Sequence, residues 1–166
     1  METINDDKAS QSDSDAISTL SSACISLGIS IGLKNTGRCG ICIETINGIE
    51  LGKLKLDIKN LLDTTKETIF DLSYSIHADI NHGYIWIIID ATRIEDSVAR
   101  IIAVGEIMEQ KSFPPQYLSA VFEFSKHGTD FQPYYLIYNY KLDKFYPFVP
   151  ITSRRNARNK KEEIKL

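Results

Sequence analysis

The sequence is poor in the residues on which most reactions and metal sites depend. Its 166 residues include only three cysteines and three histidines. Three cysteines, Cys24, Cys39 and Cys42, are too few and too odd in number for a disulfide framework. The chain also lacks a Gly-x-Gly-x-x-Gly sequence, a phosphate loop and a Gly-x-Ser-x-Gly elbow. These absences argue against the common nucleotide-binding folds and against a serine hydrolase.

Long hydrophobic runs are missing as well. No uninterrupted apolar run reaches the roughly 20 residues that span a bilayer. The amino terminus, METINDDKASQSDSD, is acidic and polar, and it has neither the basic start nor the apolar core of a signal peptide. We therefore expect a cytoplasmic protein, with residues 1–13 as a disordered leader.

What remains is the composition of one ordinary globular domain, with 43% apolar and 25% charged residues. The net charge of −3 is unevenly distributed. Residues 154–166 contain six basic and two acidic side chains, a net charge of +4, which leaves −7 for the rest. An acidic body argues against nucleic acid as the main partner. We expect a domain over residues 14–152 and a basic, helical tail over residues 153–166.

Hydrophobic periodicity predicts helices alternating with pairs of strands. The expected helices are a short one from Ser14 or Asp15 to Ser22, one over Leu51–Thr65 and one over Arg93–Lys111. Ile25–Leu33 fits either a strand or the end of a helix, and Asn35–Gly37 reads as a turn. The expected strands are Cys39–Ile46, Ile69–Ile80, Tyr84–Ile89, Tyr117–Phe124 and the two arms of a hairpin over Tyr134–Pro150. Strands joined mainly by hairpins predict a single α+β domain, mainly an antiparallel sheet with helices packed on one face.

Two residues predict local packing. Gly105 lies on the apolar stripe of the helix over Arg93–Lys111, where glycine costs about 1 kcal/mol of helix propensity relative to alanine. We expect the compensation to be close approach to a sheet or another helix. Pro147 cannot donate a ladder hydrogen bond, so the second arm of the final hairpin should be an edge strand.

Two small groups could carry chemistry. Cys39 and Cys42 have Cys-x-x-Cys spacing, but zinc needs further ligands and a redox pair needs a helix start. In a strand, residues three apart point to opposite faces, which favours buried structural cysteines. His77, Asp79 and His82 surround a predicted turn, and a polar strand face explains them as well as a metal does. An enzyme using Cys39, Cys42, His77 or His82 is the alternative function; no metal or cofactor is expected.

The final hairpin is the most aromatic stretch of the chain. Alternation places Tyr134, Leu136, Tyr138 and Tyr140 on one face of its first strand and Tyr135 and Ile137 on the other. An uncovered aromatic face is the best candidate for a protein contact. The candidate partner surface is Tyr135, Tyr138, Tyr140, Phe145, Tyr146 and Phe148. A second alternative is a surface that binds nucleic acid or an anionic membrane through Arg154, Arg155 and Arg158.

Several short stretches together resemble one known family. They are Tyr-x-Trp at Tyr84–Trp86, Gln-Tyr-Leu at Gln116–Leu118, and Tyr-Asn-Tyr-Lys at Tyr138–Lys141 leading into Phe-Tyr-Pro-Phe-Val-Pro at Phe145–Pro150. The turn at Lys34–Gly37 extends the match. The chain resembles the PspAB family of proteins associated with phage shock protein A, from about Ala16 to Asn156.

The resemblance implies a small cytoplasmic accessory protein, encoded near phage shock protein A and often near a membrane protease of the HtpX type. It implies a role in the envelope-stress response, a protein partner such as phage shock protein A, possible contact with the membrane and no enzyme activity. Two departures are expected to matter. The polar leader differs from the family's short apolar start, and relatives are expected to continue past Asn156 into a segment containing tryptophan, so this chain lacks that segment's function or is a fragment.

Overall fold

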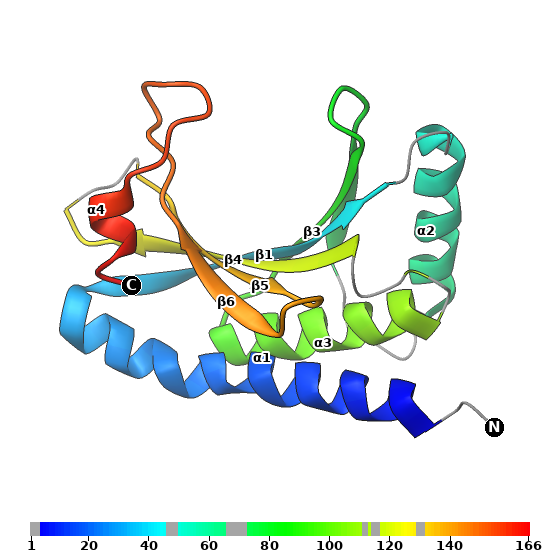
Figure 1. Ribbon diagram of the computed structural model, residues 1–166, viewed down its shortest axis with the longest axis horizontal. Coiled ribbons are helices and arrows are strands. Elements are labelled where there is room, and N and C mark those ends of the chain that lie inside the picture. The colour runs from blue at the N-terminus through cyan, green and yellow to red at the C-terminus, as the bar shows by residue number, and fades with distance from the viewer. Residues whose placement is uncertain (1–3, 46–49, 66–72, 111–112, 114–116, 129–131) are drawn as a thin grey trace.

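In the computed structural model, helices cover one face of a six-stranded antiparallel sheet (Figure 1). The structure describes residues 4–45, 50–65, 73–110, 113, 117–128 and 132–166. The strand order is β2-β3-β1-β4-β5-β6, and every neighbouring pair is antiparallel. This confirms the predicted α+β fold. The elements are α1 (Ile4–Ile31), β1 (Leu33–Glu44), α2 (Leu51–Thr65), β2 (Tyr74–Asp79), β3 (Tyr84–Asp90), α3 (Ile94–Gln110), β4 (Leu118–Lys126), β5 (Tyr134–Asn139), β6 (Lys144–Phe148) and α4 (Lys160–Glu163).

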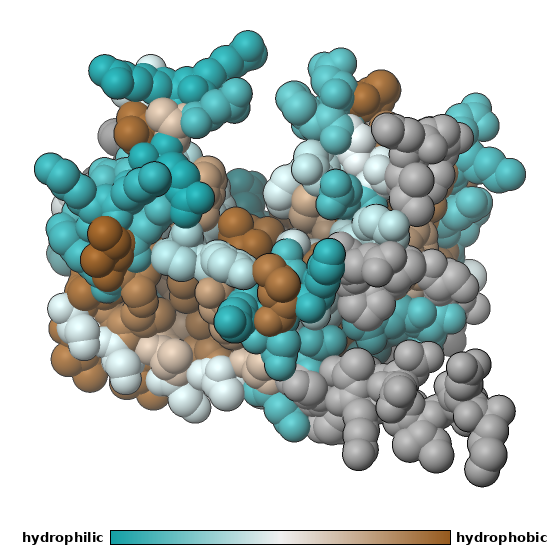
Figure 2. Space-filling model, in the orientation of Figure 1, coloured by the Kyte–Doolittle hydropathy of each residue, from teal (hydrophilic) through white to brown (hydrophobic). Residues whose placement is uncertain are grey.

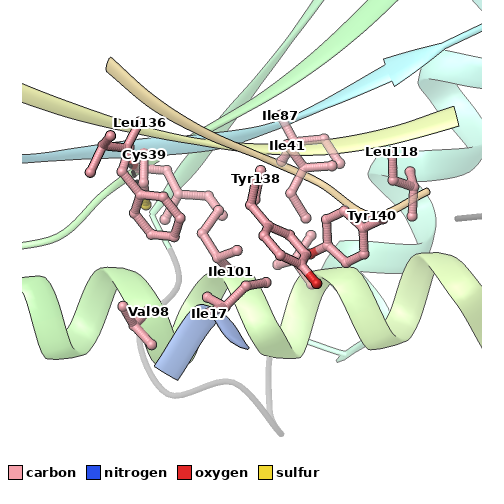
Figure 3. Close-up of a cluster of buried hydrophobic side chains, with 14 of the residues drawn as sticks. Ile17, Cys39, Ile41, Ile87, Val98, Ile101, Leu118, Leu136, Tyr138 and Tyr140 are labelled. Atoms are coloured by element: carbon pink, nitrogen blue, oxygen red, sulfur yellow. Dashed lines mark hydrogen bonds between the residues drawn. The ribbon is translucent and has the colours of Figure 1, made fainter. Parts of the chain in front are cut away.

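The core lies between the sheet and the helices α1 and α3. Alternate residues of each central strand point into it, as in β5, where Tyr134, Leu136 and Tyr138 are buried and the residues between them are half-buried. Figure 3 shows Tyr138 and Tyr140 pointing from the sheet towards Ile17 of α1 and the apolar side of α3. The helix α2 packs against β2 at the other end of the sheet.

The glycine in α3 is explained by Tyr140, which follows β5. Gly105 is buried, and a Cβ atom there would lie 2.6 Å from the Tyr140 hydroxyl oxygen. The predicted close approach is therefore confirmed, with an aromatic side chain just beyond a strand as the neighbour. The Tyr140 hydroxyl is buried and has no hydrogen-bond partner among the described residues.

The helix α1 is fastened to the sheet by a buried carboxylate. Asp13 is only 6% exposed, and the Tyr138 hydroxyl lies 2.5 Å from its Oδ1 and 2.6 Å from Oδ1 of Asp143. The hydroxyl has one proton and so can donate fully to only one of these carboxylate oxygens at a time. Burial raises the pKa of Asp13, and the charge of Asp143 raises it further, while the bond from Tyr138 opposes both.

The helix α1 differs from the elements predicted for the N-terminal part of the chain. Residues 4–13 are helical and continue into α1, whereas a disordered leader and a short helix were expected; residues 1–3 lie outside the described part. Ile25–Ile31 is the end of the same helix. Asn35–Gly37 is no turn between elements, because it lies within β1, at an irregularity in the pairing with β4 between Asn35 and Cys39.

One segment of α1 is long and apolar enough to span a membrane, although the sequence has no uninterrupted apolar run of that length. The part of α1 over Asp13–Ile31 is long and apolar enough to cross a membrane by length and composition alone. In the structure its Ile17 and Leu20 belong to the hydrophobic core, but only 11% of the segment is buried, and signal sequences near an N-terminus pass the same test as membrane-spanning helices.

The tail also differs from its prediction. Only Lys160–Glu163 is helical, and the segment before it returns along the end of β6, where Pro150 and Arg158 form an isolated bridge. Glu163 is 6% exposed, and its Oε1 accepts hydrogen bonds from the backbone N–H of Val149 and from Arg158. The Arg158 guanidinium holds the Glu163 pKa below its ordinary value. These tertiary partners hold residues that composition alone assigned to a solvated helix.

The remaining predicted elements are found, with ends shifted by a few residues. Pro147 lies in β6, which is an edge strand, as predicted. The expected start of the second strand at Ile69–Leu72, the end of the first at Ile46 and the Gln116 of the family pattern lie outside the described residues.

Replacing Gly105 with alanine tests the contact with Tyr140. We expect Gly105→Ala to lower the free energy of unfolding by about 1–3 kcal/mol, because the added methyl group meets a buried ring. Combining it with Tyr140→Phe, which removes the hydroxyl oxygen nearest to that methyl group, should recover part of the loss. Gly52→Ala in the first turn of α2 is the control, because no atom lies within 4 Å of its Cβ position, and it should not destabilise the chain. Equal effects at both glycines in denaturant unfolding would contradict the contact.

Asp13→Asn tests the buried carboxyl group. Because the native pKa of Asp13 is raised above its ordinary value of 3.8, its contribution to stability is complete below that value and is lost as pH rises through the native pKa. Asparagine keeps an oxygen acceptor for Tyr138 and has no charge. We expect Asp13→Asn to gain stability relative to wild type between about pH 4 and pH 7. Asp57→Asn, on exposed α2 surface, is the control, and the same pH slope in both variants would count against the interpretation.

Candidate partner-binding site

The face of the sheet opposite α1 and α3 is not covered by any described helix. Figure 1 shows this face as the concave upper side of the sheet, with the β2–β3 turn rising at one end and the segment after β6 at the other. In Figure 2 the same two segments form largely hydrophilic lobes on either side of a gap. The central strands β3, β1, β4 and β5 each have partners on both sides, so a ligand here meets side chains rather than a free strand edge.

An apolar groove of about 320 Å³ lies on this open face. Its floor includes Gly40 of β1, which pairs with Ile88 of β3 on one side and Val121 of β4 on the other. Glycine is required there, because a Cβ atom would lie 2.6 Å from the carbonyl oxygen of Ile87. The groove is thus formed by a residue without a side chain between residues with large ones. Its other apolar lining residues are Trp86, Tyr135, Ile137 and Phe148.

Charged groups at the rim are mostly engaged with one another. Arg38 Nε lies 3.6 Å from Asp90 Oδ1, and both side chains are more than half exposed. Glu123 accepts a hydrogen bond from the Tyr135 hydroxyl at 3.2 Å. Arg158 of the tail lies over the Phe148 ring, 5.7 Å from its centroid. This leaves a floor that is apolar and a rim that can orient a polar partner.

The predicted aromatic surface is divided by the sheet. Tyr135 and Phe148 line the groove, and Tyr146, which is 40% exposed, pairs with Ile137 on the same face. The prediction is wrong for Tyr138 and Tyr140, which are 0% and 6% exposed in the core. Phe145 is also on the helix side, because it pairs with Tyr138 and their rings are 5.1 Å apart. The helices decide which face is buried, and strand alternation alone does not reveal that choice.

The rest of the groove was not singled out from the sequence. Trp86, Ile88 and Val121 come from strands that are separated in the chain and meet only through β1. A signal was present in Tyr84–Asp90, where Trp86 and Ile88 fall on the face opposite Ile85, Ile87 and Ile89. A continuous apolar strand is apolar on both faces, so its second face needs a cover or a ligand.

The three tail arginines do not form one surface. Arg158 is held by Glu163 at 2.8 Å and reaches the groove through Phe148. Arg154 and Arg155 are exposed on the loop before it and form no ion pair in the described part of the chain. These two arginines remain accessible to an anionic partner.

Cys39 and Cys42 lie on opposite faces of the sheet. Cys39 points into the core, and Cys42, three residues on, pairs with Trp86 on the open face, as strand geometry predicts. Burial raises the thiol pKa of both to about 12, and that of Cys24 on α1 to about 11. Thiols with these pKa values remain protonated near neutral pH, where a nucleophile or a zinc ligand must be a thiolate.

The histidines are only partly brought together. His82 Nδ1 lies 2.9 Å from Asp79 Oδ2 in the β2–β3 turn, and this contact lowers the Asp79 pKa. His77 contacts Ser75 instead, with 3.1 Å between Nε2 and Oγ. Among the described residues, no three His, Cys, Asp or Glu side chains are grouped in a way that could hold a metal ion.

Thiol labelling tests whether any cysteine is reactive in the folded chain. Because the thiolate is the reactive form, we expect a disulfide reagent such as dithionitrobenzoate to label the native chain at about pH 8 at least tenfold more slowly than the unfolded chain. The matched control is the same chain in guanidinium, where all three cysteines are exposed. A native thiol that reacts as fast as the unfolded chain would contradict this expectation and favour the thiol-dependent alternative.

Comparison with known proteins gives a family. The model of the family PspAB, described as PspA associated protein B, matches residues 2–166. No curated protein and no solved structure matches. The match includes both α1 and the tail, which agrees with their packing on the sheet.

Proposed function

The chain belongs to the PspAB family, and from that membership we propose that it is a non-catalytic accessory protein that binds phage shock protein A (PspA) or a related component of the membrane-stress response in the cytoplasm. The family description supplies the association with PspA. The adaptor role and the stress response are our proposal, and the open face of the sheet supports them.

The single observation behind the proposal is the apolar groove on an uncovered sheet face. Exposed aromatic and aliphatic side chains that form a continuous hollow mark contact sites on protein surfaces. The groove has the composition of an interface core, with Trp86, Tyr135 and Phe148 around aliphatic residues, and a rim that includes Arg38 and Arg158. Nothing in its lining resembles a set of reacting groups.

The geometry favours a helical segment as the bound part of the partner. The groove lies over β1, β3, β4 and β5, whose backbone hydrogen bonds are already made within the sheet, so a partner cannot add as a strand there. An amphipathic helix instead presents apolar side chains at i, i+3 or i+4 and i+7. One large side chain would enter the hollow above Gly40, between Ile88 and Val121.

Filling the groove tests the proposal. Val121→Trp places a large ring beside Gly40, and we expect it to weaken binding to purified PspA at least tenfold, or about 1.4 kcal/mol. Leu142→Trp is the matched control, because it adds the same ring at a side chain that is 50% exposed in the β5–β6 turn. Binding is measured by isothermal titration, with unfolding curves to show that both variants are folded. If PspA binds Val121→Trp as tightly as wild type, the groove is not the contact.

A further inference from the structure

The middle of the open sheet face is a row of side chains that crosses five strands. Cross-strand pairing places one residue of each strand in this row. Its members, in strand order from β3 to β6, are Ile88, Gly40, Val121, Ile137 and Tyr146. Neighbouring strands are about 4.8 Å apart, so the row is about 19 Å long. A helix of about 13 residues, or three to four turns, covers that length.

Two residues further along each strand, towards the loop after β6, lies a charged row. Its members are Asp90, Arg38, Glu123, Tyr135 and Phe148. Both carboxylates of this row already have partners. Asp90 lies 3.6 Å from Arg38, and Glu123 accepts hydrogen bonds from Tyr135 at 3.2 Å and from Thr36 at 3.0 Å.

The loop after β6 adds two arginines at this side of the groove. A backbone hydrogen bond of 2.8 Å from the Ile151 N–H to the Ala157 carbonyl closes the loop. Arg158 follows it and lies over the ring of Phe148, which lines the groove. Arg154 and Arg155 are exposed on the loop and form no ion pair within the described residues, whereas Arg38 and Arg158 each have a carboxylate partner. The unpaired positive charge on this side therefore comes from the loop.

The opposite side of the groove has a different charge. Two residues from the middle row, towards the β2–β3 turn, the row consists of Trp86, Cys42, Ser119, Asn139 and, at its end on β6, Lys144. Beyond this largely neutral row, Glu44 and Asp79 both pair with Tyr84. A ligand in the groove thus meets arginines on one flank and mainly neutral or acidic residues on the other.

We propose that the groove selects an amphipathic helix of three to four turns that crosses the strands and carries acidic side chains on the flank facing the loop after β6. Its apolar side chains contact the middle row, and its acidic side chains contact Arg154 and Arg155. Complementary charges at the rim of an interface fix the orientation of a partner and speed its association. This inference rests on the proposed function and deepens it, because it states which class of helix the groove accepts.

The shape of the face favours a helix over a membrane or a nucleic acid. The loop after β6 and the β2–β3 turn rise at the two ends of the strands, with the gap between them (Figures 1 and 2). A helix in this gap has to cross the strands, whereas a flat bilayer would meet the two raised segments before it reached the floor. The middle row has no basic side chain, so a nucleic acid would find no phosphate contact there.

Peptide binding to the full chain tests the inference. Trp86 is the only tryptophan of the chain and lines the groove, so its fluorescence reports whether the groove is occupied. The probes are two synthetic helical peptides of three to four turns, without tryptophan, that share one apolar face and carry either glutamate or lysine along one flank. We expect the glutamate peptide to bind at least tenfold more tightly at low salt. This preference should decrease at high salt, which screens exposed charges.

Charge reversal on the loop provides the matched variants. Arg154→Glu with Arg155→Glu should remove the preference for the glutamate peptide. Lys53→Glu with Lys55→Glu is the control, because it makes the same change of charge at two exposed lysines of α2, which packs against β2. The control should keep the preference, and unfolding curves show that both variants are folded.

Four results would overturn the inference. They are no change of Trp86 fluorescence with either peptide, equal affinity for both peptides, equal loss of preference in the lysine control, and tighter binding of anionic vesicles than of the glutamate peptide through Arg154 and Arg155. The titration of Val121→Trp with PspA is separate from these. PspA binding without a peptide preference overturns only this inference, and a peptide preference without PspA binding overturns only the choice of PspA.

Discussion

The hydroxyl of Tyr138 joins parts of the chain that are 125 residues apart, and much of the structure depends on where it lies. It is buried at the centre of the helix side of the sheet, beside the rings of Tyr140 and Phe145. Its contact with Asp13 fixes α1 across the sheet, and Tyr140 in turn fits against Gly105 of α3. One tyrosine pair therefore contacts both helices that cover this face of the sheet.

With both long helices on one side, the other side of the sheet remains available. Its central strands are apolar on both faces, so the exposed face is an apolar groove and not a charged surface. The groove over Gly40 therefore lies on a sheet face that no described helix covers.

Local periodicity was enough to predict most of the sheet, α2, α3 and the edge position of β6. It predicted even the crowding at Gly105, because a glycine on the apolar stripe of a helix costs stability unless a neighbour packs closely against it. Periodicity could not predict the features that depend on contacts between residues distant in the sequence. The burial of Asp13 comes from Tyr138, the order of the tail comes from Val149 and Arg158, and the covered face of β5 is chosen by α1 and α3. For the same reason the uncovered face holds Tyr135 and Phe148 of the predicted aromatic surface, whereas Tyr138 and Tyr140 are buried on the other face.

The bridge between Pro150 and Arg158 has a consequence for assembly. A sheet with two free edges can grow in either direction, since each edge strand offers unpaired N–H and C=O groups to another chain. Here the end of β6 is occupied, because Pro147 has no N–H, the Val149 N–H donates to Glu163 and the Val149 carbonyl accepts from Asn159. These contacts leave fewer unpaired backbone groups at the C-terminal end of β6 for another chain. The basic tail, whose composition suggests a charged appendage, thus caps the C-terminal end of an edge strand.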